Sequence, residues 1–165
     1  MKDRTKKLAV AGVIAAIYTV LTLFPGLSMF SFGAIQIRIS EVLCVLPIFT
    51  PAAIYGLTIG CFVSNILSSA GPLDMIFGTF ATLIAAVCTY RMRRLSPGVA
   101  LVPPVVFNGV IVGFMITYFY TETAGRFGQV LLLNISTVAL GEFCVCYILG
   151  LPLISYLKKH KNIFY

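Results

Sequence analysis

Residues 32–51 contain Arg38 and Glu41, three positions apart in an otherwise apolar run. On a helix these two residues share a face and can form an ion pair. Ionisable groups at membrane depth are costly, face a protein interior or a watery cavity, and indicate a functional site by default. We therefore expect the rest of the chain to bury this stretch, and we take its two charges as the start of a candidate binding site.

The composition excludes a soluble domain. The chain has 165 residues, of which 59% are hydrophobic and only 10% charged, against roughly 25% charged residues in soluble proteins. We predict an all-α, polytopic membrane protein, with residues 1–165 forming a single transmembrane domain and no separate catalytic domain. The sequence has no GxxxxGK[ST] phosphate loop, so the chain cannot by itself couple nucleotide hydrolysis to another process.

The net charge of +7 reflects membrane topology better than nucleic-acid binding. Ten of the twelve basic residues lie in three clusters at the ends of apolar segments, and only Arg38 and Arg126 stand apart. The clusters are Lys2, Arg4, Lys6 and Lys7; Arg91, Arg93 and Arg94; and Lys158, Lys159 and Lys161. Cytoplasmic segments of membrane proteins are enriched in Lys and Arg, so we expect both termini in the cytoplasm of a multi-pass protein of the cell membrane.

The apolar pattern predicts six transmembrane helices in one bundle. They cover about residues 8–27, 34–49, 51–68, 72–90, a fifth segment from near Pro103 to about Tyr118, and 127–157. The first could imitate a signal peptide, but its apolar run is long and no small-x-small site closes it. The run 34–68 is divided at Thr50-Pro51, where Thr can cap a helix and Pro can open it. Only this division places all three basic clusters on one side. Residues 26–33 are a candidate lid.

Several polar residues should meet near the outer ends of three helices. If 34–49 runs inward, Arg38 and Glu41 lie about 6–11 Å below its outer end at 1.5 Å per residue. The candidate binding residues at that depth are Gln36, Arg38, Glu41, Asn65 and Asp74. Such convergence is typical of an outward-facing small-molecule pocket. Asp74, in the first turn of its helix, could instead only complement the helix dipole.

Two further polar residues lack an explanation in their apolar context. Asn108 must find a hydrogen-bond partner or cost free energy, and a bond to another helix is the commoner answer. Glu142 lies about 22 Å along the last helix at 1.5 Å per residue, so either that helix starts later or the pocket is deep. Two or three carboxylates against one arginine favour a ligand with several N–H donors. The structural alternative is a buried ion pair, which is weak evidence for stability.

Enzyme and metal chemistry find little support. All five cysteines lie in apolar segments, where cysteine behaves as a small hydrophobe, and no His or Cys pair completes a metal site. The single histidine, His160, lies in the basic tail, so no Ser/His/Asp or Cys/His set exists. We expect no enzyme activity, no metal and no cofactor.

A stripe of small residues in the first helix would let another helix approach closely. It consists of Ala11 and Ala15, with Gly12 and Ala16 beside them. Such stripes usually serve internal packing, and a docking face for a partner subunit is the alternative.

Several motifs together resemble one known family. They are Phe32-Gly33-Ala34-Ile35-Gln36-Ile37-Arg38-Ile39-Ser40-Glu41, Leu46-Pro47, Phe49-Thr50-Pro51-Ala52-Ala53, Gly60-Cys61, Asp74-x-x-Phe77-Gly78, Gly141-Glu142 and Gly150-Leu151-Pro152-Leu153. The sequence is similar to the QueT family, substrate-binding (S) components of energy-coupling factor (ECF) transporters for queuosine precursors. The similarity is dense over about residues 30–89 and returns in 141–153.

The resemblance implies more than the spacing does. It implies a deazapurine ligand, the aminomethyl or cyano deazaguanine base or queuine, held in an outer pocket. It implies docking, through an Ala-x-x-x-Ala pattern matching Ala11 and Ala15, on one membrane scaffold subunit and two ATPases. Glu41, Asp74 or Glu142 would accept the ligand's N–H groups, with Arg38, Gln36 or Asn108 on the ring carbonyl.

Other functions remain open at this point. The nearest is an S component for another metabolite, such as a vitamin, because the fold does not fix the ligand. Inverted repeats in the sequence would favour a self-sufficient secondary transporter, and we see no convincing inverted repeat here. A structural membrane subunit is a further alternative.

Overall fold

The computed structural model describes residues 2–24, 38–67 and 71–160. The candidate lid at 26–33 and Gln36 lie outside these ranges. Within them the chain is all-helical, as predicted. The helices are α1 (Lys2–Leu23), η1 (Ile39–Ile48), α3 (Ala52–Leu67), α4 (Pro72–Met92), α5 (Pro97–Ala100), α6 (Val102–Phe119), α7 (Phe127–Phe143), η2 (Cys144–Leu149) and α8 (Gly150–Lys159).

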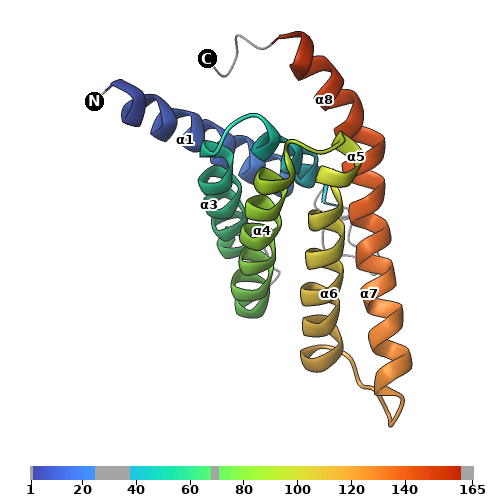
Figure 1. The fold of residues 1–165 in the computed structure, drawn as a ribbon. Helices are drawn as coiled ribbons and strands as arrows, with labels where there is room; N and C mark the ends of the chain where they lie inside the picture. Colours follow the sequence, from blue (N-terminus) through green and yellow to red (C-terminus); the bar gives the residue numbers. More distant parts are fainter. Residues whose placement is uncertain (1, 25–37, 68–70, 161–165) are drawn as a thin grey trace.

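The helices form a row that closes around η1. Contacts join α1 to α3, α3 to α4, α4 to α6 and α6 to α7, while η1 packs against α1, α3, α4, η2 and α8. Figure 1 shows α3, α4, α6 and α7 side by side, with α1 crossing near their upper end at a steep angle. The stretch that carries Arg38 and Glu41 therefore leads into the helix that the others surround, as the sequence predicted.

η1 is a 3₁₀ helix rather than the expected α-helix. Glu41 N donates to Arg38 O and Phe49 N to Leu46 O, both at 2.9 Å and both three residues back. Pro47 lies inside this helix and has no N–H for the bond to the fourth residue back. In a 3₁₀ helix, side chains three residues apart are eclipsed, which places Cys44 over Glu41.

In two pairs of helices, glycine residues allow the two backbones to pack in close contact. A Cβ on Gly56 of α3 would lie 2.8 Å from Ala11 O of α1, and one on Gly60 would lie 3.0 Å from Ala15 O. In the second pair, a Cβ on Gly113 of α6 would lie 2.7 Å from the Cα of Ile135 of α7. Only glycine allows these backbone approaches, which are typical of helix packing in membranes.

The last three helices form one continuous run, Phe127–Lys159, of 33 residues. Its middle part, η2, is a π-helix, and Pro152 is the third residue after its end. Since Pro152 cannot donate a backbone bond and its ring crowds the carbonyl four residues before it, a wider turn there relieves the clash. In Figure 1 the run bends between α7 and α8.

Four helical segments of the described chain are long and apolar enough to cross a membrane. They are Arg4–Leu23, Pro72–Met92, Pro97–Phe119 and Phe127–Lys159, whereas Ile39–Ile48 and Ala52–Leu67 are shorter apolar helices. The six predicted helices thus all have a counterpart, but the count of six crossings stays a prediction. Three boundaries were wrong. α1 begins at Lys2 rather than residue 8, and it ends at Leu23 rather than 27. The helix predicted over 34–49 begins only at Ile39, after the extended Arg38.

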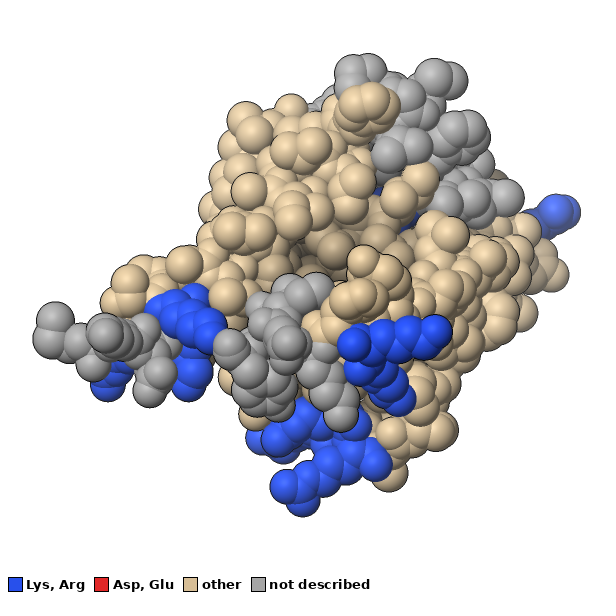
Figure 2. Space-filling view, turned by 90° about the horizontal axis from the view of Figure 1, so that it is seen from above, with Lys and Arg blue, Asp and Glu red and all other residues tan. Residues whose placement is uncertain are grey.

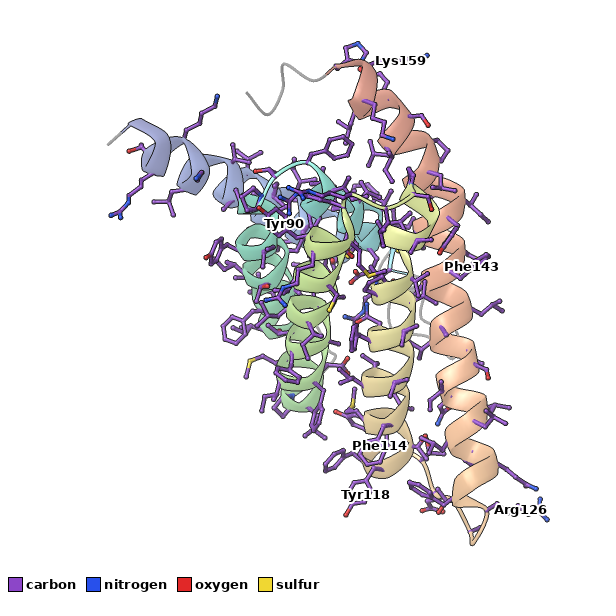
Figure 3. The ribbon with its side chains drawn as sticks, in the orientation of Figure 1. Tyr90, Phe114, Tyr118, Arg126, Phe143 and Lys159 are labelled. Atoms are coloured by element: carbon purple, nitrogen blue, oxygen red, sulfur yellow. The ribbon has the colours of Figure 1, made fainter. Side chains whose placement is uncertain are left out.

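The two ends of the molecule differ in charge. The first turn of α1 and the last turn of α8 lie at the upper end in Figure 1, and Figure 3 places Lys159 there and Arg126 at the opposite end. Seen from above, the described residues show Lys and Arg in several groups, and no Asp or Glu is visible (Figure 2). This clustering agrees with the topology that the sequence predicts.

Candidate functional site

The candidate residues within the described chain are all buried in the helix bundle. Their exposed fractions lie between 2% for Glu41 and 7% for Arg38. They come from the start of η1 (Arg38, Glu41), α3 (Asn65), α4 (Asp74), α6 (Asn108) and α7 (Glu142). Burying so many polar groups costs free energy unless each has a hydrogen-bond or ion-pair partner. The partners of each residue therefore indicate which groups are available to bind a ligand.

Arg38 and Asp74 form an ion pair that joins the start of η1 to α4. Arg38 Nη2 donates to Asp74 Oδ1 at 3.0 Å, with both side chains buried. Asn65 Nδ2 donates to the backbone carbonyl of Asp74, also at 3.0 Å. The predicted convergence of these three residues is therefore confirmed. Asp74 has a third role beside the two considered from the sequence, because it neutralises a buried arginine.

Gly78 explains why these three side chains fit together. A Cβ at this position would lie 3.2 Å from Asn65 Nδ2 and 3.7 Å from Arg38 Nη1. Gly78 lies one helical turn after Asp74, so the motif Asp74-x-x-Phe77-Gly78 provides the carboxylate and the space beside it.

Glu41 does not pair with Arg38, and that prediction was wrong. It assumed an α-helix through both residues, whereas Arg38 is extended (φ −93°, ψ 102°) and precedes the 3₁₀ helix. The carboxylate of Glu41 instead accepts hydrogen bonds from the hydroxyl of Tyr18 of α1 and from Cys44 Sγ, the latter at 2.8 Å. Both of its oxygens are thus held by uncharged donors.

Glu142 lies close to Glu41 although the two are 101 positions apart. Cys146 Sγ lies 3.8 Å from Glu142 Oε2 and 3.8 Å from the backbone carbonyl of Glu41. Because α7 begins at Phe127 as predicted, a later helix start does not explain the depth of Glu142. The other alternative, a deep pocket that reaches Glu142, stays a prediction.

Neither of these two carboxylates forms an ion pair with a residue that the structure describes. Within the described ranges the only ion pair is Arg38–Asp74. Glu41 and Glu142 thus bring two buried acidic groups together with hydroxyl and thiol donors as their neighbours. A buried carboxylate is expensive without a charged or multiply donating partner, and a ligand that carries N–H groups would supply one.

Asn108 faces the same problem. It is 4% exposed, and its Nδ2 has no hydrogen-bond partner in the part of the chain that the structure describes. The interhelical hydrogen bond expected of it is made elsewhere, by Asn134 Nδ2 of α7 to Thr117 Oγ1 of α6 at 2.9 Å. An unpaired amide is a donor available to a ligand carbonyl.

Tyr18, Cys44 and Cys146 are site residues that the sequence reasoning missed. Tyr18 is fully buried, and an apolar helix with one tyrosine gave no signal for this role. The position of Cys44, three residues after Glu41, could have indicated a contact if a 3₁₀ helix had been expected. The cysteines were taken as packing residues, and no group of three or more metal-ligating side chains occurs in the described ranges.

Ala11 and Ala15 lie where α1 crosses α3. Ala11 is 5% exposed and Ala15 is partly buried, and their backbone carbonyls lie against Gly56 and Gly60. These contacts agree with the packing alternative. The neighbouring Gly12 and Ala16 are exposed, and a Cβ on Gly12 would meet nothing within 4 Å.

Comparisons with known proteins point to one family. The family model described as "QueT transporter" matches residues 8–159. The queuosine precursor transporter QueT of Lactococcus lactis subsp. cremoris (strain MG1363) is 41% identical over 83 residues, which are 50% of this chain and 48% of that protein. The matched part thus spans about half the length of this curated relative. No solved structure matches the chain.

Proposed function

Because the chain belongs to the QueT transporter family, we propose that it is the substrate-binding S component of an ECF-type importer. It captures a queuosine precursor at the outer face of the cell membrane. The precursor is an aminomethyl or cyano deazaguanine base, or queuine. The related protein of Lactococcus lactis is a queuosine precursor transporter by name, which supports this substrate class.

The observation that carries the proposal is that the buried carboxylates of Glu41 and Glu142 form no ion pair with any described Lys or Arg. A guanine-like edge offers several N–H donors, and an aminomethyl group adds a positive charge. We propose that Glu41 or Glu142 accepts the N–H edge and that the other receives the aminomethyl group. Hydrogen bonds to charged groups are stronger than those between neutral ones, so this ligand offsets the cost of burying both acids.

The ring carbonyl of the ligand needs a donor at the same depth. Asn108 Nδ2 is the best candidate, because it is buried and has no partner within the described residues. Gln36 lies outside the described ranges, and we keep it as a ligand contact because of its place beside Arg38 in the sequence. Arg38, Asn65 and Asp74 form the wall beside the ligand, and their mutual contacts support the site's shape.

We propose six membrane crossings with both termini in the cytoplasm. The concentration of basic residues at the end that carries both termini supports this orientation (Figure 2). With η1 and α3 counted as short crossings, Arg38 and Asp74 lie toward the outer side. The candidate lid at 26–33 then precedes the site in the chain on that side.

Transport requires partners, and we propose one ECF membrane scaffold subunit and two ATPases. The chain itself is then not an enzyme and binds no nucleic acid. We place the docking surface on α1 around Ala11 and Ala15, with the exposed Gly12 and Ala16 beside them. α1 is the least enclosed of the long helices, since 22% of the residues in its apolar window are buried against 39–50% in the others. A helix so exposed, with small residues on its surface, suits close contact with another helix.

The test is calorimetric titration of the detergent-purified full chain with the aminomethyl deazaguanine base, queuine, guanine and thiamine. We expect tight binding of the first or second and little binding of thiamine. The variant Glu41→Gln keeps the shape of the side chain and removes its charge, so affinity should fall. Undiminished affinity in Glu41→Gln would overturn the role of Glu41. Preference for thiamine would support an S component for a vitamin, and uptake by cells without the ATPases would favour a secondary transporter.

A further inference from the structure

A groove of about 650 Å³ runs along the outside of the bundle between α1 and α3. One wall is a single face of α1, with lining residues from Arg4 to Ala15. The other wall begins at Pro51 and follows α3 to Ile59. The binding site described above lies elsewhere, since none of its residues lines this groove.

The groove has two chemically different parts. Most of its lining is apolar and open to the surroundings, with Leu8 75%, Tyr55 68% and Ile59 52% exposed. At one end lie two cations, Arg4 and Lys7, both exposed. None of the described residues that line the groove is acidic, so the described wall offers these two cations no counter-charge.

This arrangement matches the shape and charge of a phospholipid. An acyl chain would lie along the apolar wall, which extends about 10 Å from Leu8 to Ala15 at 1.5 Å per residue. The phosphate would lie between the guanidinium of Arg4 and the ammonium of Lys7, both of which bind phosphate groups in proteins. Tyr55 is a residue type that is enriched where membrane meets water.

We propose that the α1–α3 groove binds one anionic phospholipid, with its headgroup held by Arg4 and Lys7. With the N-terminus in the cytoplasm, as proposed above, this lipid belongs to the inner leaflet, which carries anionic headgroups. Because Ala11, Gly12 and Ala15 all line the groove, the lipid covers the proposed α1 docking surface in the undocked subunit. A partner that docks there would displace it.

Native mass spectrometry of the detergent-purified full chain tests the proposal. The chain is titrated with phosphatidylglycerol and with phosphatidylcholine of the same acyl chains. We expect phosphatidylglycerol to bind roughly tenfold more tightly, since each basic residue near a membrane surface contributes favourably to binding anionic lipid. The double variant Arg4→Gln/Lys7→Gln should remove most of this preference.

The matched control is Lys158→Gln/Lys159→Gln, which removes the same charge from the end of α8. It should keep the preference for phosphatidylglycerol. If both double variants lose it equally, the preference reflects net charge, and the groove is not the site. If Arg4→Gln/Lys7→Gln binds lipid normally but no longer retains the ATPase module, the groove belongs to a protein partner and the proposal is overturned.

A second variant tests the groove by shape rather than by charge. Gly12→Leu adds a side chain where a Cβ would meet nothing within 4 Å, so it should fill the groove without disturbing the fold. It should weaken binding of both phospholipids several-fold and leave binding of the deazaguanine base unchanged. Unaltered lipid binding by this variant would contradict the proposal. Failure of the chain to bind any deazapurine would leave the lipid result standing, so the two proposals are tested separately.

Discussion

The bundle contains two regions of buried charged residues, and these residues have different kinds of partner in the two regions. Around Arg38 and Asp74 the charges cancel in an ion pair, and Asn65 bonds to the same turn of α4. Around Glu41 and Glu142 two carboxylates lie close together, and their described contacts are a tyrosine hydroxyl and cysteine thiols. Among the described residues, the first region contains the direct ion pair, whereas no Lys or Arg forms an ion pair with the carboxylates of the second.

The difference separates a structural role from a binding role. Removing one partner of a complete buried pair leaves the other charge uncompensated, so such a change should damage stability. Removing an acid from a region with excess negative charge should cost little stability and should instead weaken the binding of a ligand that supplies the missing charge. Both regions contain buried acids on apolar helices, so only their contacts distinguish them.

The largest effect is expected from Asp74→Ala. This substitution leaves the guanidinium of Arg38 buried without its carboxylate, and we expect a loss of about 3–5 kcal/mol in the free energy of unfolding. Thermal unfolding of the purified chain in detergent measures it. The control is Glu122→Ala, which removes an exposed acid and should unfold as the wild type does. If Asp74→Ala also unfolds as the wild type does, the ion pair is not what holds η1 to α4.

In contrast to Asp74→Ala, Glu142→Gln should weaken ligand binding without lowering the stability of the chain. The ligand-free chain should unfold at the same temperature or higher, because repulsion between two neighbouring acids is relieved. Affinity for the aminomethyl deazaguanine base should fall by about 10- to 100-fold, the range expected for a hydrogen bond to a charged group. Affinity for the cyano base, which carries no positive charge, should fall less, and calorimetry with both ligands measures the difference. This difference is expected if Glu142 receives the aminomethyl group, whereas an equal loss for the two bases would assign Glu142 to the N–H edge.

Tyr18→Phe tests whether the hydroxyl that α1 provides stabilises the Glu41 carboxylate. It removes the hydroxyl that donates to Glu41 and keeps the ring, so the acid loses one of its two described donors. We expect a loss of about 1–3 kcal/mol in the free energy of unfolding. Tyr55→Phe removes an equivalent hydroxyl from a residue that is 68% exposed and should have no measurable effect. Equal stability of the two variants would mean that the Tyr18 hydroxyl does not hold Glu41.

The smallest effect is expected from Gly78→Ala. Its added Cβ would press on Asn65 Nδ2 at 3.2 Å, so the side chains beside Asp74 must shift by a few tenths of an ångström. The cost should be about 1 kcal/mol, at the low end for overpacking a filled site. Gly12→Ala is the matched change at an open position and should be neutral or slightly stabilising, since alanine favours a helix over glycine. Thermal unfolding compares the two, and a stabilising Gly78→Ala would show that the site has spare room.

The sequence predicted the helices well because apolar length, proline positions and charge clusters act locally. The division at Thr50-Pro51 and the start of the last helix at Phe127 are both observed. The prediction failed where local geometry departs from an ideal α-helix. The segment around Pro47 is a 3₁₀ helix that begins only at Ile39. Arg38 precedes it in extended backbone and pairs with Asp74 rather than with Glu41.

The sequence predicted which residues lie in the candidate site better than it predicted the contacts between them. Convergence of Arg38, Asn65 and Asp74 followed from depth alone, because a residue's distance along a helix fixes its level in the membrane. The closeness of Glu142 to Glu41 depends on how α7 and η2 pack beside η1, which no spacing within one segment reveals. The role of Tyr18 depends in the same way on the crossing of α1 and α3.

The most direct test of this account is a structure of the chain bound to the aminomethyl deazaguanine base. The account predicts that ligand N–H groups lie about 3 Å from carboxylate oxygens of both Glu41 and Glu142, within hydrogen-bond distance. It also predicts that the Arg38–Asp74 ion pair remains intact beside the ligand. A ligand bound to Asp74, with Arg38 displaced and Glu41 and Glu142 untouched, would contradict the division into a structural pair and a binding pair.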